Sequence, residues 1–319
     1  MAVTRNQFTE NYKKDLYGYF WEAYPMKTPL YETLFEVVQS DAAYEMFTSA
    51  IGLGKLLEKP ENEDIQADAP MESYTIVCKN RSWARKVRFS YESVKDSKKT
   101  PNFIAAVVAS WGRTLPITKE EFYAKFFNYG AYTAGNDIFS NTITDVVTDS
   151  SGNLIYDGQP FFSDSHPDRV GGTYDNFNSS SSLSFDNLKT EYTKMTTVNN
   201  RDERGNIIDL YPTVLLIPGA LKFTAIEVLQ SEKEPDVFNN TINSLRNIIT
   251  PVEWSYITGA TVWFLGVPRM GLMATNREDV SLDFYQDEEN LSYVARVFTR
   301  FGGAVTNWRY WNSCNLATS

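Results

Sequence analysis

The segment Pro212–Ser231 constrains the fold of this chain most strongly. It reads PTVLLIPGALKFTAIEVLQS. Its first part, Thr213–Ile217, is a short run of β-branched and aliphatic residues, and a proline and a glycine typical of a turn follow it. Apolar residues then return at helical spacing over Ala220–Gln230. The pattern predicts a buried strand that leads directly into an amphipathic helix, and therefore an α+β core.

The length and composition predict a globular protein. A chain of 319 residues can hold one large domain or two modest ones, and 42% hydrophobic residues suffice for packed cores. Apolar stretches such as Phe103–Trp111 are far shorter than the roughly 20 residues that a membrane span needs. The first residues lack the apolar segment of a secretory signal, so we expect synthesis in the cytoplasm and no membrane partner.

The two cysteines, Cys78 and Cys314, form no pattern with each other or with histidine. Without a CxxC or Cys/His group, neither a disulfide framework nor a zinc site is predicted. We expect two reduced thiols, no metal and no cofactor.

Charge is distributed unevenly along the chain. The formal net charge of −10 argues against a protein whose main task is to grip nucleic acid, because phosphate contacts rely on clustered Lys and Arg. Residues 1–70 carry twelve acidic and six basic residues, whereas residues 71–100 carry eight basic and three acidic ones. An acidic segment therefore precedes a basic one.

The acidic segment has helical patterns over roughly Gln7–Ala23 and Leu30–Leu57. The first is rich in aromatic residues, among them Phe20, Trp21 and Tyr24, which need a surface to cover them. That surface could belong to the same domain or to a neighbouring subunit.

The basic segment predicts a β-hairpin over Ser73–Tyr91, with its turn at Asn80, Arg81 and Ser82. Alternation gives it one aromatic and one cationic face, and an isolated hairpin would be marginal in water, so it should pack against another surface. The candidate subunit-interface residues in the two segments are Phe20, Trp21, Tyr24, Arg81, Trp83, Arg85, Lys86 and Arg88.

A long helix is predicted from Pro101 to Gly130. Pro116 should kink or split it, and Thr118 with Glu121 could form a capping box for its second part.

The remainder of the chain shows strand and helix patterns of ordinary length. Further expected elements are strand and turn material over Gly130–Gly158, a helix Phe185–Thr196 capped by Ser184, strands Ile248–Glu253 and Ala260–Val267, and a long strand or strand pair over Tyr293–Arg309 broken at Gly302 and Gly303.

The single histidine, His166, lies in the loop FFSDSHPD. Its neighbours Ser163, Asp164 and Ser165 could suggest a Ser/His/Asp triad, but triad members normally come from separate elements, and no GxSxG motif is present. A histidine with a structural role in a turn is the better interpretation.

Other patterns that could carry chemistry are incomplete. Gly52–Lys55 lacks the spacing of a phosphate loop, and the carboxylate runs Glu61–Asp64 and Asp287–Glu289 match no calcium loop. Seven Trp and nineteen Tyr could form a sugar-binding platform, although aromatic residues at subunit interfaces are as common. No set of residues forms an active site, so we expect no enzyme.

The order of the elements and two strings resemble a known family. DGQPFFSDSHP at Asp157–Pro167, followed by the strand and helix of Pro212–Ser231 and a late WFLG strand, is similar to the major capsid protein of tailed bacteriophages. The resemblance implies the Hong Kong 97-type capsid fold and is nearest to the Mu-type head subunit.

The resemblance implies a division of the chain into parts. These are an N-terminal arm (1–69), an extended E-loop hairpin (70–99), the spine helix of a peripheral domain (100–130), an axial domain (131–270), and strands that return to the peripheral domain (271–319). Pro116 departs from the unbroken spine helix of the family.

The resemblance also implies a function. We expect self-assembly into hexamers and pentamers of an icosahedral head, portal and scaffolding proteins as partners, and non-specific contact with packaged double-stranded DNA inside the virion. The acidic arm and basic hairpin could satisfy each other between copies. The alternatives are a soluble carbohydrate-binding or carbohydrate-active protein and an encapsulin-like compartment shell.

Overall fold

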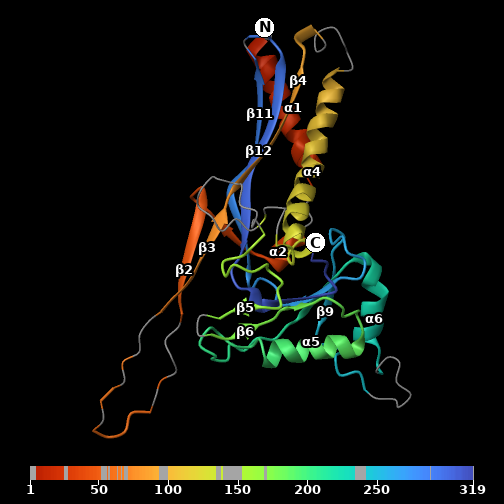
Figure 1. Ribbon diagram of the computed structural model, residues 1–319. Coiled ribbons are helices and arrows are strands. Elements are labelled where there is room, and N and C mark those ends of the chain that lie inside the picture. The colour runs from red at the N-terminus through yellow and green to blue at the C-terminus, as the bar shows by residue number, and fades with distance from the viewer. Residues whose placement is uncertain are drawn as a thin grey trace.

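Two sheets and a projecting ribbon define the architecture (Figure 1). The computed structural model describes residues 5–24, 28–51, 56, 58–62, 64–65, 67, 71–92, 100–133, 138, 153–168, 171–233, 242–287 and 289–318. The helices are α1 (Arg5–Ala23), α2 (Tyr31–Leu34), α4 (Thr100–Asn128), α5 (Phe185–Thr197) and α6 (Lys222–Gln230), with single 3-10 turns η1 (Gly219–Leu221) and η2 (Trp308–Tyr310).

The strands divide among four sheets, two of which have only two strands. In chain order they are β1 (Glu36–Gln39), β2 (Tyr44–Ile51), β3 (Met71–Lys79), β4 (Arg81–Phe89), β5 (His166–Pro167), β6 (Thr173–Tyr174), β7 (Phe177–Asn178), β8 (Val214–Ile217), β9 (Thr250–Glu253), β10 (Trp263–Gly266), β11 (Leu272–Gln286), β12 (Tyr293–Val305) and β13 (Trp311–Cys314).

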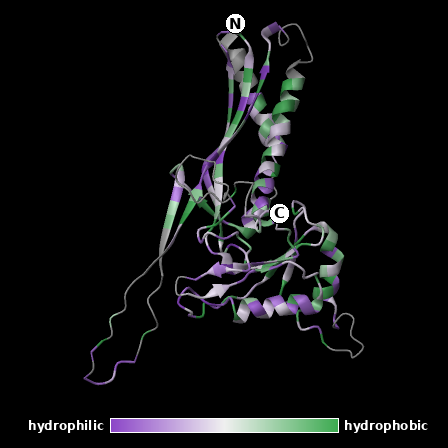
Figure 2. Cartoon of the chain, in the orientation of Figure 1, coloured by the Kyte–Doolittle hydropathy of each residue, from purple (hydrophilic) through white to green (hydrophobic). Residues whose placement is uncertain are grey.

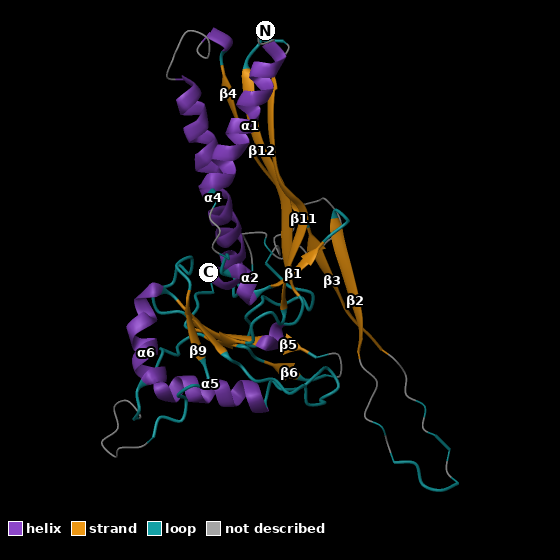
Figure 3. Cartoon of the chain, turned by 180° about the vertical axis from the view of Figure 1, so that it is seen from behind, coloured by secondary structure: helices purple, strands orange, loops and turns teal. Residues whose placement is uncertain are grey.

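The four-stranded sheet has the order β1-β11-β12-β4 and forms the long part of the molecule (Figure 3). Helices α1 and α4 cover one of its faces, where alternate residues of β4, β11 and β12 are apolar. This core includes Leu16 and Phe20 from α1, Val108 from α4, and Leu282 and Val297 from the strands. The helix predicted over Gln7–Ala23 is confirmed. Its buried side chains pack on the four-stranded sheet of the same chain and not on a neighbouring subunit.

Helix α1 lies directly against α4. A Cβ atom at Gly112 would lie 2.6 Å from the backbone oxygen of Phe20, a distance that real side chains do not reach. The glycine therefore allows the two helices to approach closely.

Helix α4 continues through Pro116 over its 29 residues. The predicted split is wrong, and Thr118 donates its hydroxyl to the Thr114 carbonyl instead of capping a new helix. Proline removes one backbone hydrogen bond, but apolar residues on both sides of it, such as Val108 and Phe126, are fully buried in core clusters. Tertiary packing therefore holds the helix together.

The hairpin predicted over Ser73–Tyr91 is wrong, because its two strands pair with different partners. Strand β3 pairs with β2 in a two-stranded ribbon, and β4 pairs with β12 in the four-stranded sheet. Between them lies Asn80, which is buried, accepts from the Thr275 hydroxyl and donates to the Ser40 hydroxyl. The chain thus passes from ribbon to sheet at a single residue.

The helix predicted over Leu30–Leu57 is also wrong for most of its length. After the single turn α2, the chain forms β1, which pairs with β11, and β2, which pairs with β3. Strand partners that are remote in sequence determine this segment, so a local periodicity could not identify it.

The five-stranded sheet has the order β7-β13-β10-β8-β9 and forms the other part of the molecule (Figure 1). Strand β8 has four buried residues, and α6 buries Ala225, Val228 and Leu229 in the same core as Leu215 and Leu265. The strand and helix predicted for Pro212–Ser231 are therefore confirmed, as are the strands matching β9 and β10.

Helix α5 begins at Ser184, whose hydroxyl accepts a hydrogen bond from the backbone N–H of Asn187 at 3.3 Å. This is the predicted N-cap. Most of the strand and turn material expected over Gly130–Gly158 lies outside the described residues.

The predicted break at Gly302 and Gly303 is wrong, because β12 runs unbroken across both. A Cβ atom at Gly302 would lie 2.4 Å from the backbone oxygen of Lys79, and one at Gly303 would lie 2.9 Å from the Phe126 ring. These glycines permit β3 and α4 to pack closely on the strand.

Residues 271–319 do not all return to one part. Strands β11 and β12 belong to the four-stranded sheet, but β13 lies between β7 and β10 in the five-stranded sheet. The expected range 271–319 therefore contributes strands to both sheets. Within the described residues, no helix is long and apolar enough to span a membrane.

Candidate functional site

A cationic surface lies on the face of the four-stranded sheet away from α1 and α4. It comprises Lys86 and Arg88 on β4 and Arg296 and Arg300 on β12, and we call it the basic sheet face. Antiparallel register places Arg296 opposite Lys86 and Arg300 opposite Ser82, so the four side chains share one face. The helices cover the other face through the apolar residues between them.

The basic sheet face is only partly neutralised within the chain. Arg296 donates to the Asp283 carboxylate, and Arg88 lies 3.8 Å from that of Asp287. Lys86 makes no ion pair with any residue that the structure describes, and its cross-strand neighbour Arg296 has the same charge. Like charges in opposite positions are unfavourable, so an anionic partner would stabilise this face.

The predicted cations divide between two faces. Lys86 and Arg88 lie on the basic sheet face, whereas Arg81 and Arg85 alternate onto the side of the helices. Arg81 donates to the Ile138 carbonyl at 3.5 Å, and Arg85 is exposed. The predicted alternation of β4 is confirmed, although its pairing is not.

The predicted aromatic residues have mixed environments. Phe20 is fully buried within the chain, so it is removed from the interface candidates, and Trp83 stacks on Phe301 with ring centres 5.2 Å apart. Trp21 is 53% exposed, and Tyr24 is half-buried beside it. Of the four, only Trp21 presents most of its ring for contact with another molecule.

Sequence reasoning missed Arg296 and Arg300. They alternate with Val297 and Phe301 along β12, which was visible in the sequence. Their proximity to Lys86 depends on the pairing of β12 with β4, which local patterns do not specify.

An acidic loop connects β2 and β3. Its described residues project away from the rest of the chain in both views and are mainly hydrophilic (Figures 1, 2 and 3). Glu58, Glu61 and Asp64 are exposed, with Lys59 between the first two. We call these positions the acidic loop; Gly52–Lys55 lies outside the described residues.

Two apolar side chains accompany these charges. Leu56 is 100% exposed and Ile65 is 81% exposed. They are single side chains and not a contiguous apolar patch, but they offer apolar area beside the charges of the loop.

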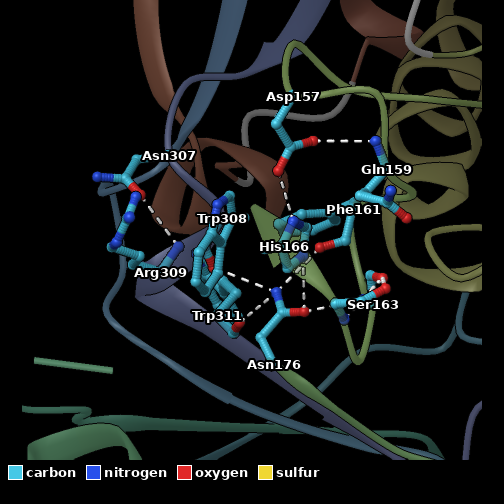
Figure 4. A network of polar contacts seen from close by, with 11 residues as sticks. Asp157, Gln159, Phe161, Ser163, His166, Asn176, Asn307, Trp308, Arg309 and Trp311 are labelled. Atoms are coloured by element: carbon cyan, nitrogen blue, oxygen red, sulfur yellow. Dashed lines mark hydrogen bonds and ion pairs between the residues drawn. The ribbon is translucent and has the colours of Figure 1, made fainter. Parts of the chain in front are cut away.

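His166 is not part of a catalytic triad. The Ser163 hydroxyl lies 3.4 Å from that of Ser165, while the His166 ring nitrogens contact Asp157 and Asn176 (Figure 4). Both His166 and Asp157 are fully buried. Its ring nitrogens contact Asp157 and Asn176 and not Ser163, and a structural role for His166, which lies on β5, stays a prediction.

The two thiols are free, as predicted, and both are buried. Burial raises the pKa of Cys78 to about 11 and raises that of Cys314 further, so neither is a reactive thiolate at neutral pH. Among the described residues, no cluster of three or more acidic, His or Cys side chains could hold a metal.

Comparison with known proteins identifies the class. Residues 74–311 match the family described as phage capsid protein. None of the curated proteins matches the chain.

Solved capsids share the fold at low identity. The mature capsid of bacteriophage PhiM1 superposes with a TM-score of 0.57 and 10% identity, covering 92% of this chain and 88% of that one. The capsid of an empty GTA particle superposes with a TM-score of 0.54 and 10% identity, covering 92% and 91%.

The chain belongs to the phage capsid protein family. It has the Hong Kong 97-type fold and is a major capsid protein of a tailed bacteriophage, a structural protein and not an enzyme. The carbohydrate-binding and encapsulin-like alternatives are not favoured.

Proposed function

We propose that this chain assembles into hexamers and pentamers of an icosahedral head, and that the acidic loop of each copy binds the basic sheet face of a neighbour. The observation that carries the proposal is the separation of the two charged surfaces within one chain. The loop extends from the β2–β3 ribbon, while the basic face lies on β4 and β12 (Figure 3).

Such a contact is heterologous, because two different patches meet. Heterologous contacts generate closed rings when the rotation closes, which is the geometry of hexamers and pentamers. Opposite charge sets the register and rate of association more than its affinity. The exposed Leu56 and Ile65 would add apolar area beside the charges.

The parts of the chain take the following roles in this proposal. The E-loop is the β2–β3 ribbon and acidic loop, so it begins earlier in the chain than expected from the sequence. Residues preceding the ribbon form the arm, α4 is the spine helix, the four-stranded sheet is the peripheral domain, and the five-stranded sheet is the axial domain.

The remaining partners follow from the same role. The chain would be made in the host cytoplasm and would meet portal and scaffolding proteins during assembly. Packaged double-stranded DNA would contact the inner surface without sequence preference.

Electron microscopy tests the assembly directly. Negative staining of the purified chain should show closed particles or capsomers with five- and six-fold views, and size exclusion should show matching masses. A homogeneous monomer at high protein concentration would contradict self-assembly.

Assembly should slow as the salt concentration rises. Between about 50 and 500 mM, the screening length falls from roughly 14 to 4 Å, so exposed opposite charges attract over a shorter range. Light scattering during assembly measures the rate. A rate that is constant or rises over this range would contradict charge steering.

A further inference from the structure

A single buried asparagine joins the β2–β3 ribbon to the four-stranded sheet. Asn80 lies between β3 and β4 and is 6% exposed. The ribbon leaves the sheet at this point and carries the acidic loop away from the rest of the chain (Figures 1 and 3). The direction of the ribbon at Asn80 therefore determines where the acidic loop can reach.

The Asn80 side chain uses both amide protons and its carbonyl oxygen. Nδ2 donates to the Ser40 hydroxyl at 2.7 Å and to the Ala42 carbonyl at 2.8 Å. Oδ1 accepts from the Thr275 hydroxyl at 2.7 Å. A backbone carbonyl can only accept, so the contact with Ala42 identifies Nδ2 as the nitrogen. One side chain thus binds the segment between β1 and β2 on one side and strand β11 on the other.

The contacts continue into both strands of the ribbon. On β2, Glu45 accepts from the Ser40 hydroxyl at 2.6 Å, and this bond lowers the pKa of Glu45. On β3, the Cys78 thiol lies 3.3 Å from the Thr275 oxygen, and burial raises the pKa of this thiol to about 11. At neutral pH, Glu45 is therefore a carboxylate that only accepts, and Cys78 keeps a proton that it can donate.

The donors and acceptors form one directed chain. Thr275 donates its hydroxyl proton to Asn80, so its oxygen accepts from Cys78. Ser40 donates to Glu45 at 2.6 Å, its shorter contact compared with 3.3 Å to the Ala42 carbonyl, and accepts from Asn80. Hydrogen bonds in such chains polarise and strengthen one another. We call the five linked side chains the Asn80 network: Cys78, Thr275, Asn80, Ser40 and Glu45.

Backbone hydrogen bonds attach the same region to the sheet. Asn80 donates its N–H to the Ala43 carbonyl at 3.0 Å, and Ser40 donates its N–H to the Asn276 carbonyl at 2.9 Å. The Arg277 guanidinium donates to the Ser40 carbonyl at 3.2 Å. The segment between β1 and β2 is therefore held by β11, and it holds Asn80 in turn.

Apolar contacts at the start of the ribbon lack this directionality. Ile76 and Cys78 pack in one cluster with Met273 and Ala304 of the four-stranded sheet. These contacts keep the ribbon close to the sheet, but the hydrophobic effect is non-directional. Hydrogen bonds weaken steeply when their angles change, so a set of linked bonds can fix an orientation.

We propose that the Asn80 network fixes the angle between the β2–β3 ribbon and the four-stranded sheet, with the Thr275 hydroxyl as its anchor in the sheet. The importance of this angle for assembly rests on the proposed function. A ribbon held in one direction would present the acidic loop to the basic sheet face of a neighbour before the two copies meet. Such pre-organisation reduces the entropy that is lost on binding.

Thr275→Val tests the anchor with the least change in shape. Valine keeps the branched outline but removes the proton that the buried Asn80 oxygen accepts. Thr275→Ser keeps the hydroxyl and should behave as the wild type does. Thr299→Val is the matched control, because Thr299 is also 1% exposed and donates to the Glu278 carbonyl at 2.9 Å in the same sheet, outside the network.

Pulsed electron spin resonance reports the orientation of the ribbon. Nitroxide labels at Met46→Cys on β2 and Arg85→Cys on β4 lie on either side of the network, and both positions are exposed, whereas the native thiols are buried. In the monomeric fraction of the full-length chain, the wild type, Thr275→Ser and Thr299→Val should each give one narrow distance distribution. Thr275→Val should give a distribution at least about twice as wide, because directional bonds are lost.

Two results would overturn the proposal. A broad distribution in the otherwise wild-type labelled chain would show that the ribbon has no fixed direction, whether or not any variant folds. Equal widths for Thr275→Val and Thr299→Val would show that the Asn80 network has no special role.

Assembly of the same variants separates this proposal from the proposed function. Light scattering should show slower assembly for Thr275→Val than for Thr299→Val. A widened distribution in Thr275→Val together with wild-type assembly would support the role of the Asn80 network and contradict the contact of the acidic loop with a neighbour.

Discussion

Leu215→Asp is expected to unfold the five-stranded sheet. Leu215 is fully buried on β8, opposite Leu265 of β10 and Pro251 of β9. Leu215 packs in a hydrophobic core that includes Leu229 and Leu265, so a carboxylate at this position would be transferred from water into apolar surroundings. The cost should exceed about 4 kcal/mol, a large part of the 5–15 kcal/mol that stabilises a typical domain.

The control for this substitution is Phe223→Asp. Phe223 lies on α6 of the same part of the molecule but is 74% exposed, so the same chemical change should alter folding stability by no more than about 0.5 kcal/mol. Circular dichroism during thermal unfolding compares the two. Equal melting temperatures for Leu215→Asp and wild type would contradict the assignment of β8 to the core.

Lys86→Glu combined with Arg88→Glu should block assembly and leave folding intact. Both side chains are exposed on the basic sheet face, so reversal would place negative charge against the acidic loop of a neighbour. A loss of about 1.4 kcal/mol at each contact weakens it tenfold, and every copy in a shell repeats the loss. The fraction assembled, measured by sedimentation, should fall by at least about tenfold.

Arg85→Glu is the matched control for these reversals. Arg85 is on the same strand and is exposed, but it alternates onto the other face. We expect it to assemble as wild type does. Equal loss of assembly from Arg85→Glu would show that net charge matters and that the basic sheet face has no special role.

The elements that could be predicted from sequence are those whose determinants are local. The β8–α6 segment has its apolar run, turn and helical spacing within Pro212–Ser231, and the structure reproduces them. The cap of α5 at Ser184 is equally local. These signals need no knowledge of distant residues.

The errors arise where distant residues decide the structure. The alternation in β3 and β4 correctly indicates two strands. However, β3 pairs with β2 and β4 pairs with β12, so β3 and β4 do not form a hairpin with each other. Likewise, Pro116 remains helical because both halves of α4 pack into cores, and the glycines of β12 serve close packing instead of a turn.

The candidate site was predicted in part for the same reason. Lys86 and Arg88 were identified from composition and alternation, but Arg296 joins them only through the β12–β4 register. The sequence assigned the acidic charge to an arm, whereas the structure places Glu58, Glu61 and Asp64 on the loop beyond β2. Charge was therefore predictable, and its position in space was not.

The most direct test of the proposed contact is a charge exchange within one chain. Glu61→Lys with Asp64→Lys reverses the acidic loop, and Lys86→Glu with Arg88→Glu reverses the basic sheet face. Each pair of substitutions alone should abolish particles in negative stain, whereas the chain that carries all four should regain them. If the fourfold variant assembles no better than either double variant, or if the double variants assemble normally, the contact between acidic loop and basic sheet face is contradicted.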